Sequence, residues 1–145
     1  MSEENKALAR KFFRMFEIGD PGMAGEIVAA DYYNHDAPNP NIGLEGVKAG
    51  VTGFKNALPD ARLKIAFQLA EGDKVATRYS WSGTHLGEIY GIPATGKPVS
   101  WTATVTFRIV DGKIREAWEN RDLLGLMQQL GVVQGVSTKN QKADQ

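Results

Sequence analysis

Residues 99–121, VSWTATVTFRIVDGKIREAWENR, contain the pattern that decides the fold class. From Val99 to Ile109 every second residue is apolar, and the residues between them are serine, threonine or arginine. This alternation with a period of two predicts a half-buried strand over 99–110. Asp111 and Gly112 follow, a pair that favours a tight hairpin turn. Residues 113–121 are therefore predicted to return as the neighbouring antiparallel strand.

Two further strands are predicted before this hairpin, and helices are predicted before those strands. Helices followed by antiparallel hairpins indicate an α+β domain. The length fits a single domain over 1–135, with a polar and flexible tail over 136–145. The other expected elements are helices over 3–18, 23–30, 44–58 and 123–130, an extended piece with a loop over 31–41, and strands over 62–71 and 74–85.

The helix predicted over 44–58 has Gly46, Gly50 and Gly53 along one stripe. A glycine inside a helix costs about 1 kcal/mol relative to alanine. We therefore expect another element to pack closely against this stripe.

The composition excludes several function classes. The chain of 145 residues has 17 Lys plus Arg and 17 Asp plus Glu, so it lacks the net basic charge that nucleic acids attract. It has no cysteine and only two histidines, so we expect no metal site and no cofactor. It shows no signal-peptide pattern and no apolar run long enough for a membrane, so a cytoplasmic protein is expected. A neutral chain suits a small apolar or aromatic ligand.

The two faces of the last predicted strand differ in chemistry. One face is mostly charged and is predicted to contact water, so the other is predicted to face inward. Burial raises the pKa of a carboxyl, which is the usual preparation of a general acid or base. An alternative stays open, because Asp122 also suits the N-cap of the helix that begins at Leu123. The water-facing set is Lys113, Arg115, Glu119 and Arg121, and the inward set is Ile114, Glu116, Trp118, Asn120 and Asp122.

Both histidines lie at the ends of predicted elements, His35 before a proline-rich loop and His85 at the end of a strand. A lone histidine is more often a structural residue than a catalyst, but sites tend to form at such ends. The aromatic residues of the strands are expected to form the core or to line an apolar pocket. These residues are Tyr33, Tyr79, Trp81, Trp101, Phe107 and Trp118.

Short motifs over nearly the whole chain resemble those of the SnoaL-like polyketide cyclase family. The motifs leave out only the polar tail. They are YNH at 33–35, GLEGV at 43–47, PD at 59–60, EGDKV at 71–75, SGTHLGE at 82–88, GIPATGK at 91–97, FRI at 107–109, DGKI at 111–114, WENRD at 118–122 and QLG at 129–131.

This resemblance implies the nuclear-transport-factor-2-like (NTF2-like) cone, in which a curved antiparallel sheet wraps around helices and encloses an apolar pocket. Cyclases of the family close a ring by intramolecular aldol condensation without metal or cofactor. Their acid/base aspartate corresponds to Asp122, and His85 and His35 match histidines that would orient the substrate. The residues expected to bind the substrate are Trp118, Trp101, Tyr33, Trp81, Asn120 and Glu116.

We therefore predict an enzyme that cyclises a small apolar carbonyl compound by acid/base chemistry. Two alternatives stay open: a ketosteroid-isomerase-like or epoxide-hydrolase-like enzyme of the same fold, and a non-catalytic small-molecule-binding protein. The hydrolase needs an Asp-Arg-Asp arrangement, and on strict alternation Arg78 and Arg121 face away from Asp122. The Ser/Thr face of the 99–110 strand is expected to contact a second subunit, in a homodimer or a higher homo-oligomer.

Overall fold

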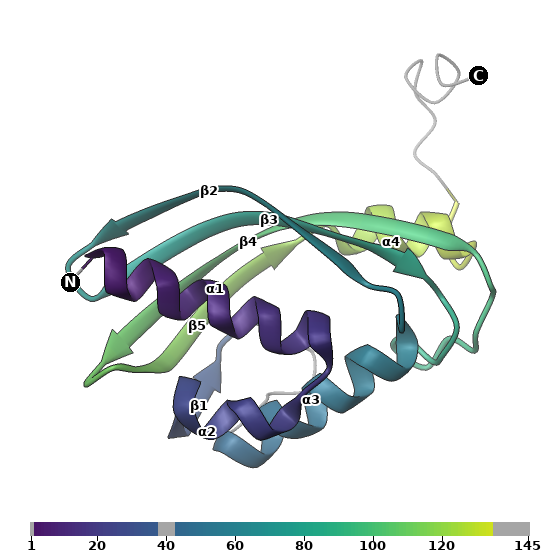
Figure 1. Cartoon of the computed structure of the whole chain (residues 1–145). Helices are drawn as coiled ribbons and strands as arrows, with labels where there is room; N and C mark the ends of the chain where they lie inside the picture. The colour runs from purple at the N-terminus through teal and green to yellow at the C-terminus, as the bar shows by residue number, and fades with distance from the viewer. Residues whose placement is uncertain (1, 38–42, 135–145) are drawn as a thin grey trace.

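The computed structural model describes residues 2–37 and 43–134. A curved five-stranded sheet arches over helices α1 (Ser2–Ile18) and α3 (Gly43–Ala57), which lie on its concave side (Figure 1). This arrangement confirms the predicted α+β class. The other elements are η1 (Pro21–Met23), α2 (Ala24–Ile27), β1 (Val28–Asn34), β2 (Arg62–Glu71), β3 (Lys74–Thr84), β4 (Pro98–Val110), β5 (Lys113–Arg121) and α4 (Leu123–Leu130).

The sheet has the strand order β1-β5-β4-β3-β2. The strands β2 to β5 pair antiparallel in sequence order, and β1 adds to β5 in parallel. The predicted β4–β5 hairpin is confirmed, and its turn residues Asp111 and Gly112 have φ of 53° and 74°. Two positive φ angles in succession define the turn type whose twist matches paired strands.

The short helix predicted over 23–30 is wrong in its length. Helix α2 ends at Ile27, and Val28 already belongs to β1, where it pairs with Ile114 of β5. The backbone of Val28 and Ala29 therefore joins a sheet in place of a helix, because tertiary pairing overrides the weak local helical preference.

The core lies between α1 and the concave face of the sheet. Phe13 and Met15 of α1 are buried, and the Phe13 ring lies 4.6 Å from Tyr79 of β3 and 5.8 Å from Phe107 of β4. The apolar residues that alternate along β4 share this inner face, as predicted. The same aromatic packing forms one wall of the cavity described below.

Two sequence predictions fall on parts of the chain outside the described residues. These are the flexible tail over 136–145 and the part of the proline-rich loop at 38–41. Within 2–37 and 43–134, no helix combines the length and the apolar character that crossing a membrane requires.

Candidate active site

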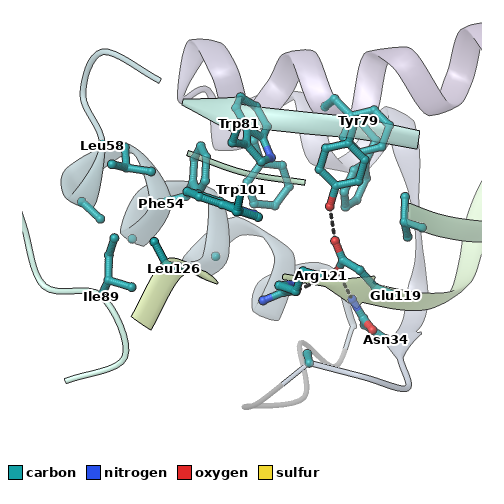
Figure 2. Close-up of a pocket in the computed structure, with 18 of the residues that line it drawn as sticks. Asn34, Phe54, Leu58, Tyr79, Trp81, Ile89, Trp101, Glu119, Arg121 and Leu126 are labelled. Carbon is teal, nitrogen blue, oxygen red and sulfur yellow. Dashed lines mark hydrogen bonds and ion pairs between the residues drawn. The ribbon is translucent and has the colours of Figure 1, made fainter. Parts of the chain in front are cut away.

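A cavity of about 310 Å³ lies between the concave face of the sheet, the helices α1, α3 and α4, and the loop at 88–90. Figure 2 shows its two ends. One end is apolar and lies among Leu58, Ile89 and Leu126, while the other carries polar side chains of β1, β3 and β5. Aromatic rings of α1, α3, β3 and β4 line the space between them. A concave, mostly apolar space with a few convergent polar groups is typical of a small-molecule site.

Glu119 is the centre of the polar end. Its side chain is only 10% exposed. The Tyr79 hydroxyl donates a hydrogen bond to Glu119 Oε2, and the amide Nδ2 of Asn34 donates one to Oε1 across 3.3 Å. Arg121 Nη2 donates to the same Oε1 across 2.7 Å. A carboxylate this buried requires such partners, since burial without them would cost several kcal/mol.

Burial and charge shift the pKa of the groups around this carboxylate. Burial, followed by the charge of Glu119, raises the pKa of Tyr79 well above its usual range. Burial alone would lower the pKa of Arg121, but Glu119 and the nearby tyrosines outweigh that effect and raise it. Tyr79 is therefore a neutral hydrogen-bond donor and Arg121 a permanent cation at neutral pH.

A second contact holds Arg121 from the side of the loop. Its Nη1 donates to the hydroxyl of Tyr90, which lies in the loop between β3 and β4. The guanidinium thus lies between a strand residue and a loop residue, and both line the cavity.

A β-bulge explains why Glu119 and Arg121 point inward, opposite to the prediction. Ile114 pairs with Ile109 and Glu116 pairs with Arg108, so Arg115 has no partner on β4. One extra residue turns every later side chain to the other face of the strand. The predicted inward face is therefore wrong beyond Ile114. The residues that this change turns outward are Glu116, Trp118 and Asn120, and those it turns inward are Ala117, Glu119 and Arg121.

Asp122 lies outside the residues that line the cavity. It is exposed and caps α4, with Oδ1 accepting the backbone N–H of Gly125 across 2.9 Å. Asp122 is thus the N-cap of α4 in the structure, which is the alternative that the sequence left open. A catalytic role for Asp122 stays a prediction.

Tyr33, His35, Glu116 and Trp118 come together, but on the outer face of the sheet. His35 Nε2 lies 2.8 Å from Glu116 Oε2. The His35 ring stacks on Trp118 at 4.9 Å and 3°, and Tyr33 contacts the imidazole edge-on at 4.8 Å. The hydrogen bonds from His35 and then from Arg108 hold the pKa of Glu116 below its usual value. None of these four residues lines the cavity, and for Glu116 and Trp118 the bulge in β5 is the reason. A role for them in binding or catalysis stays a prediction.

His85 is fully buried at the base of the 85–97 loop, and it does not line the cavity. Its Nδ1 accepts the backbone N–H of Thr95 across 3.2 Å and lies 2.9 Å from the Thr95 hydroxyl oxygen. The other ring nitrogen, Nε2, is buried and has no partner among the described residues. His85 therefore ties the two ends of the loop, and the structure does not bring it together with His35.

Trp81 and Trp101 are the two predicted site residues that line the cavity. They face each other across β3 and β4, and Phe54 of α3 lies 4.7 Å from the Trp81 ring and 6.4 Å from the Trp101 ring. The alternation along these strands predicted this placement, because neither side chain follows a bulge in its own strand.

Part of the glycine stripe of α3 contacts the cavity, and at Gly53 the close packing expected from the sequence is absent. Gly50 and Gly53 line the cavity, and a Cβ added to Gly53 would meet no atom within 4 Å. The missing side chain thus leaves space for a ligand at Gly53.

The sequence prediction missed Asn34, Glu119, Arg121 and Tyr90. The bulge in β5 is visible in the structure, since Ile114 and Ala117 are both fully buried yet three residues apart. Unbroken alternation buries residues an even number of positions apart, so it cannot bury both. Nothing local indicated Tyr90, whose partner is 31 positions away.

Comparisons with known proteins agree with this fold and with the motifs. Residues 6–130 match the SnoaL-like polyketide cyclase family. The aklanonic acid methyl ester cyclase DnrD of Streptomyces peucetius is 34% identical over 128 residues, covering 86% of this chain and 88% of DnrD.

Two solved structures share this fold. The predicted NTF2-like cone is present in this chain as a curved sheet that does not close. TsrD from Streptomyces laurentii has a TM-score of 0.84 at 31% identity, covering 90% of this chain and 97% of TsrD. AclR from Streptomyces galilaeus, a proposed hydroxylase, has a TM-score of 0.82 at 29% identity, covering 99% of this chain and 91% of AclR. The chain therefore belongs to the SnoaL-like polyketide cyclase family, as its motifs predicted.

Proposed function

We propose that the protein closes a ring in a small, uncharged, polyketide-derived carbonyl compound by an aldol-type reaction in this cavity. One observation carries the proposal: a buried carboxylate, Glu119, lies at the polar end of an aromatic-lined cavity beside a guanidinium and a phenol. The DnrD relative, by its name, is a cyclase of a methyl ester.

The lining of the cavity supports a flat and uncharged substrate. Aromatic side chains such as Phe54, Trp81 and Trp101 offer ring faces on which a planar ligand can stack. Arg121 already pairs with Glu119, so the described residues at the polar end include no unpaired cation for a substrate carboxylate. An ester avoids the cost of burying that charge without a partner.

The reaction follows from the groups at the polar end. Glu119 removes a proton from the carbon next to a carbonyl, and the electron pair of that C–H bond forms an enolate. Arg121 donates to the enolate oxygen, since its contacts to Glu119 and Tyr90 leave further N–H groups. The enolate carbon then bonds to a second carbonyl carbon of the same molecule, and Glu119 returns the proton to the new alkoxide. The product is an isomer of the substrate, and the step needs neither oxidant nor reductant.

Asp122 is a second candidate for the acid/base role, as the family resemblance implies. It directly follows Arg121, and it begins α4, whose Leu126 lines the cavity. Its carboxylate accepts from Gly125, so it would have to leave that cap to reach a ligand. We therefore assign the proton transfers to Glu119.

The epoxide-hydrolase alternative needs two carboxylates on one arginine. Sequence alternation argued against this enzyme because it turned Arg121 away from the site. The Arg121 side chain in fact lines the cavity, so that argument no longer holds. However, among residues 2–37 and 43–134 the carboxylate in ion-pair contact with Arg121 is Glu119 alone. The cavity therefore supports the cyclase better than the hydrolase.

Turnover by the Glu119→Gln variant tests the proposed function. With aklanonic acid methyl ester as the probe, wild-type protein should form an isomer with one new ring. Glu119→Gln should lower kcat by roughly 10²–10⁴-fold, the usual contribution of a general acid or base. Glu116→Gln, on the outer face of the same strand, is the matched control and should keep wild-type turnover. A wild-type protein that binds the probe but never cyclises it would favour the non-catalytic alternative.

We also propose that the outer face of the sheet packs against a second copy of the chain. Phe67 and Leu69 of β2 lie on this face with 55% and 64% exposure, and the β4 threonines continue the same surface. Exposed apolar side chains in one patch are typical of an interface. Phe67→Glu should convert a dimer into a monomer in sedimentation velocity, and a monomeric wild-type protein would contradict the proposal.

A further inference from the structure

Tyr90 occupies a strained backbone position next to the polar end of the cavity. Ile89 and Ile92 exchange two backbone hydrogen bonds, of 3.1 Å and 2.8 Å, around the two-residue turn Tyr90-Gly91. The φ angles of these turn residues are 49° and 80°. A turn with two positive φ angles favours asparagine, aspartate or glycine in its first position, since a larger side chain there crowds the backbone.

The same chain has a second turn of this kind, with a favoured residue in the first position. Asp111 and Gly112 form it between β4 and β5, with φ of 53° and 74°. Tyr90 thus stands where the turn itself would favour aspartate or asparagine, as at position 111. A strained residue persists where the surrounding structure holds it, and such residues cluster at functional sites.

The surrounding loop holds Tyr90 firmly. At its base, the backbone N–H groups of Gly96 and Thr95 bind the carbonyl oxygen and the Nδ1 of His85. Leu86 and Gly87 both donate to the carbonyl oxygen of Ala57 at the end of α3. Gly87 approaches α3 so closely that a Cβ there would overlap the Asn56 carbonyl. The fold therefore fixes the position from which Tyr90 reaches the cavity.

We propose that Tyr90 is a positioning residue, whose hydroxyl fixes the Arg121 guanidinium for the enolate oxygen. The Tyr90 hydroxyl accepts from Nη1 while Glu119 accepts from Nη2, so the plane of the guanidinium is held from two sides. This role rests on the proposed function of Glu119 and Arg121. It explains why the chain keeps a bulky residue at a position that is strained for it.

Two variants of Tyr90 separate the hydroxyl from the turn. Tyr90→Phe removes only the hydroxyl, and Tyr90→Asn also relieves the turn. Both should accelerate hydrogen exchange of the Arg121 guanidinium in NMR by roughly tenfold or more, because an ordered hydrogen bond is lost. Both should lower kcat for aklanonic acid methyl ester by roughly 10- to 100-fold with little change in KM, since a misplaced group costs about that much.

Thermal unfolding supplies the readout for strain. Tyr90→Asn should raise Tm by about 2–5 °C, as expected for a relieved turn in a domain of this size, while Tyr90→Phe should not. Asp111→Asn, which exchanges two favoured residues at the matched turn, is the control and should change neither Tm nor turnover.

Unchanged Arg121 exchange in Tyr90→Phe would overturn the positioning role, and a lower Tm for Tyr90→Asn would overturn the strain. Full activity of Glu119→Gln would instead overturn the proposed function. In that case the exchange measurement still reports on the Tyr90–Arg121 contact, so the two failures are distinguishable.

Discussion

Arg121 donates to Glu119 across 2.7 Å, and both side chains point into the cavity from the same face of β5. Their exposures are 22% and 10%, so each charge depends on the other for compensation. A partly buried pair of this kind makes the two residues one unit, in which the loss of either partner leaves an uncompensated charge.

A double-mutant cycle should show this coupling. Glu119→Gln and Arg121→Gln should each lower the free energy of unfolding by about 1–3 kcal/mol, because each leaves a charged group without its partner. The double variant should lose less than the sum, with a coupling energy of about 0.5–3 kcal/mol. Urea unfolding of the four proteins measures the cycle. Strictly additive losses would show that the pair does not act as a unit.

The cap of α4 predicts a different response at Asp122. Asp122→Ala should lower the free energy of unfolding by about 1 kcal/mol, whereas Asp122→Asn should keep it, since asparagine caps as well as aspartate. Urea unfolding of both variants is the measurement. Equal stability of the alanine and asparagine variants would show that the bond to Gly125 does not stabilise the helix.

The alternation from Val99 to Ile109 and the Asp111-Gly112 turn predicted β4, the hairpin and the start of β5, because these features depend on neighbouring residues. The placement of Trp81 and Trp101 in the cavity followed from the same periodicity. Local sequence patterns were therefore enough to predict the fold class and one wall of the cavity.

The polar end of the cavity depends on relationships that local patterns do not contain. The bulge at Arg115 adds one residue without any turn motif, yet it exchanges the faces of every later side chain in β5. The contacts of Glu119 with Asn34 and of Arg121 with Tyr90 join residues 85 and 31 positions apart. Such pairs form only when the sheet and the loop are assembled, so Asp122 stood out in the sequence where Glu119 did not.

Gly53 should control both stability and ligand size. Because an added Cβ at Gly53 meets no atom within 4 Å, Gly53→Ala should stabilise the protein. The gain should be about 1 kcal/mol, the difference in helix propensity.

Gly53→Leu should narrow the cavity and weaken binding of a planar tricyclic probe such as 1,8-dihydroxyanthraquinone, measured by fluorescence titration. Ala49→Leu, on the same helix but outside the cavity lining, should leave that binding unchanged. Equal affinity of Gly53→Leu and wild type would place the ligand elsewhere.

Glu116 should contribute to stability at neutral pH and lose that contribution in acid. His35 and then Arg108 hold the pKa of Glu116 below its ordinary value of 4.5. The unfolded chain therefore takes up a proton at a higher pH than the folded chain does. The contribution is complete above the unfolded pKa and is lost as the pH falls through the folded one.

Glu116→Gln should accordingly show a smaller loss of unfolding free energy than wild type between about pH 6 and about pH 3. Chemical denaturation at both pH values measures the difference. Glu45→Gln, an exposed residue of α3, is the control. A wild-type acid dependence in Glu116→Gln would argue against this ion pair.

The most direct test of the central claim is deuterium exchange at the reacting carbon of aklanonic acid methyl ester in D₂O, followed by NMR. If Glu119 removes the proton next to the carbonyl, wild-type protein and Asp122→Asn should exchange it well above the buffer rate. Glu119→Gln should leave the exchange at the buffer rate. Exchange that persists in Glu119→Gln and disappears in Asp122→Asn would contradict the assignment and move the acid/base role to Asp122.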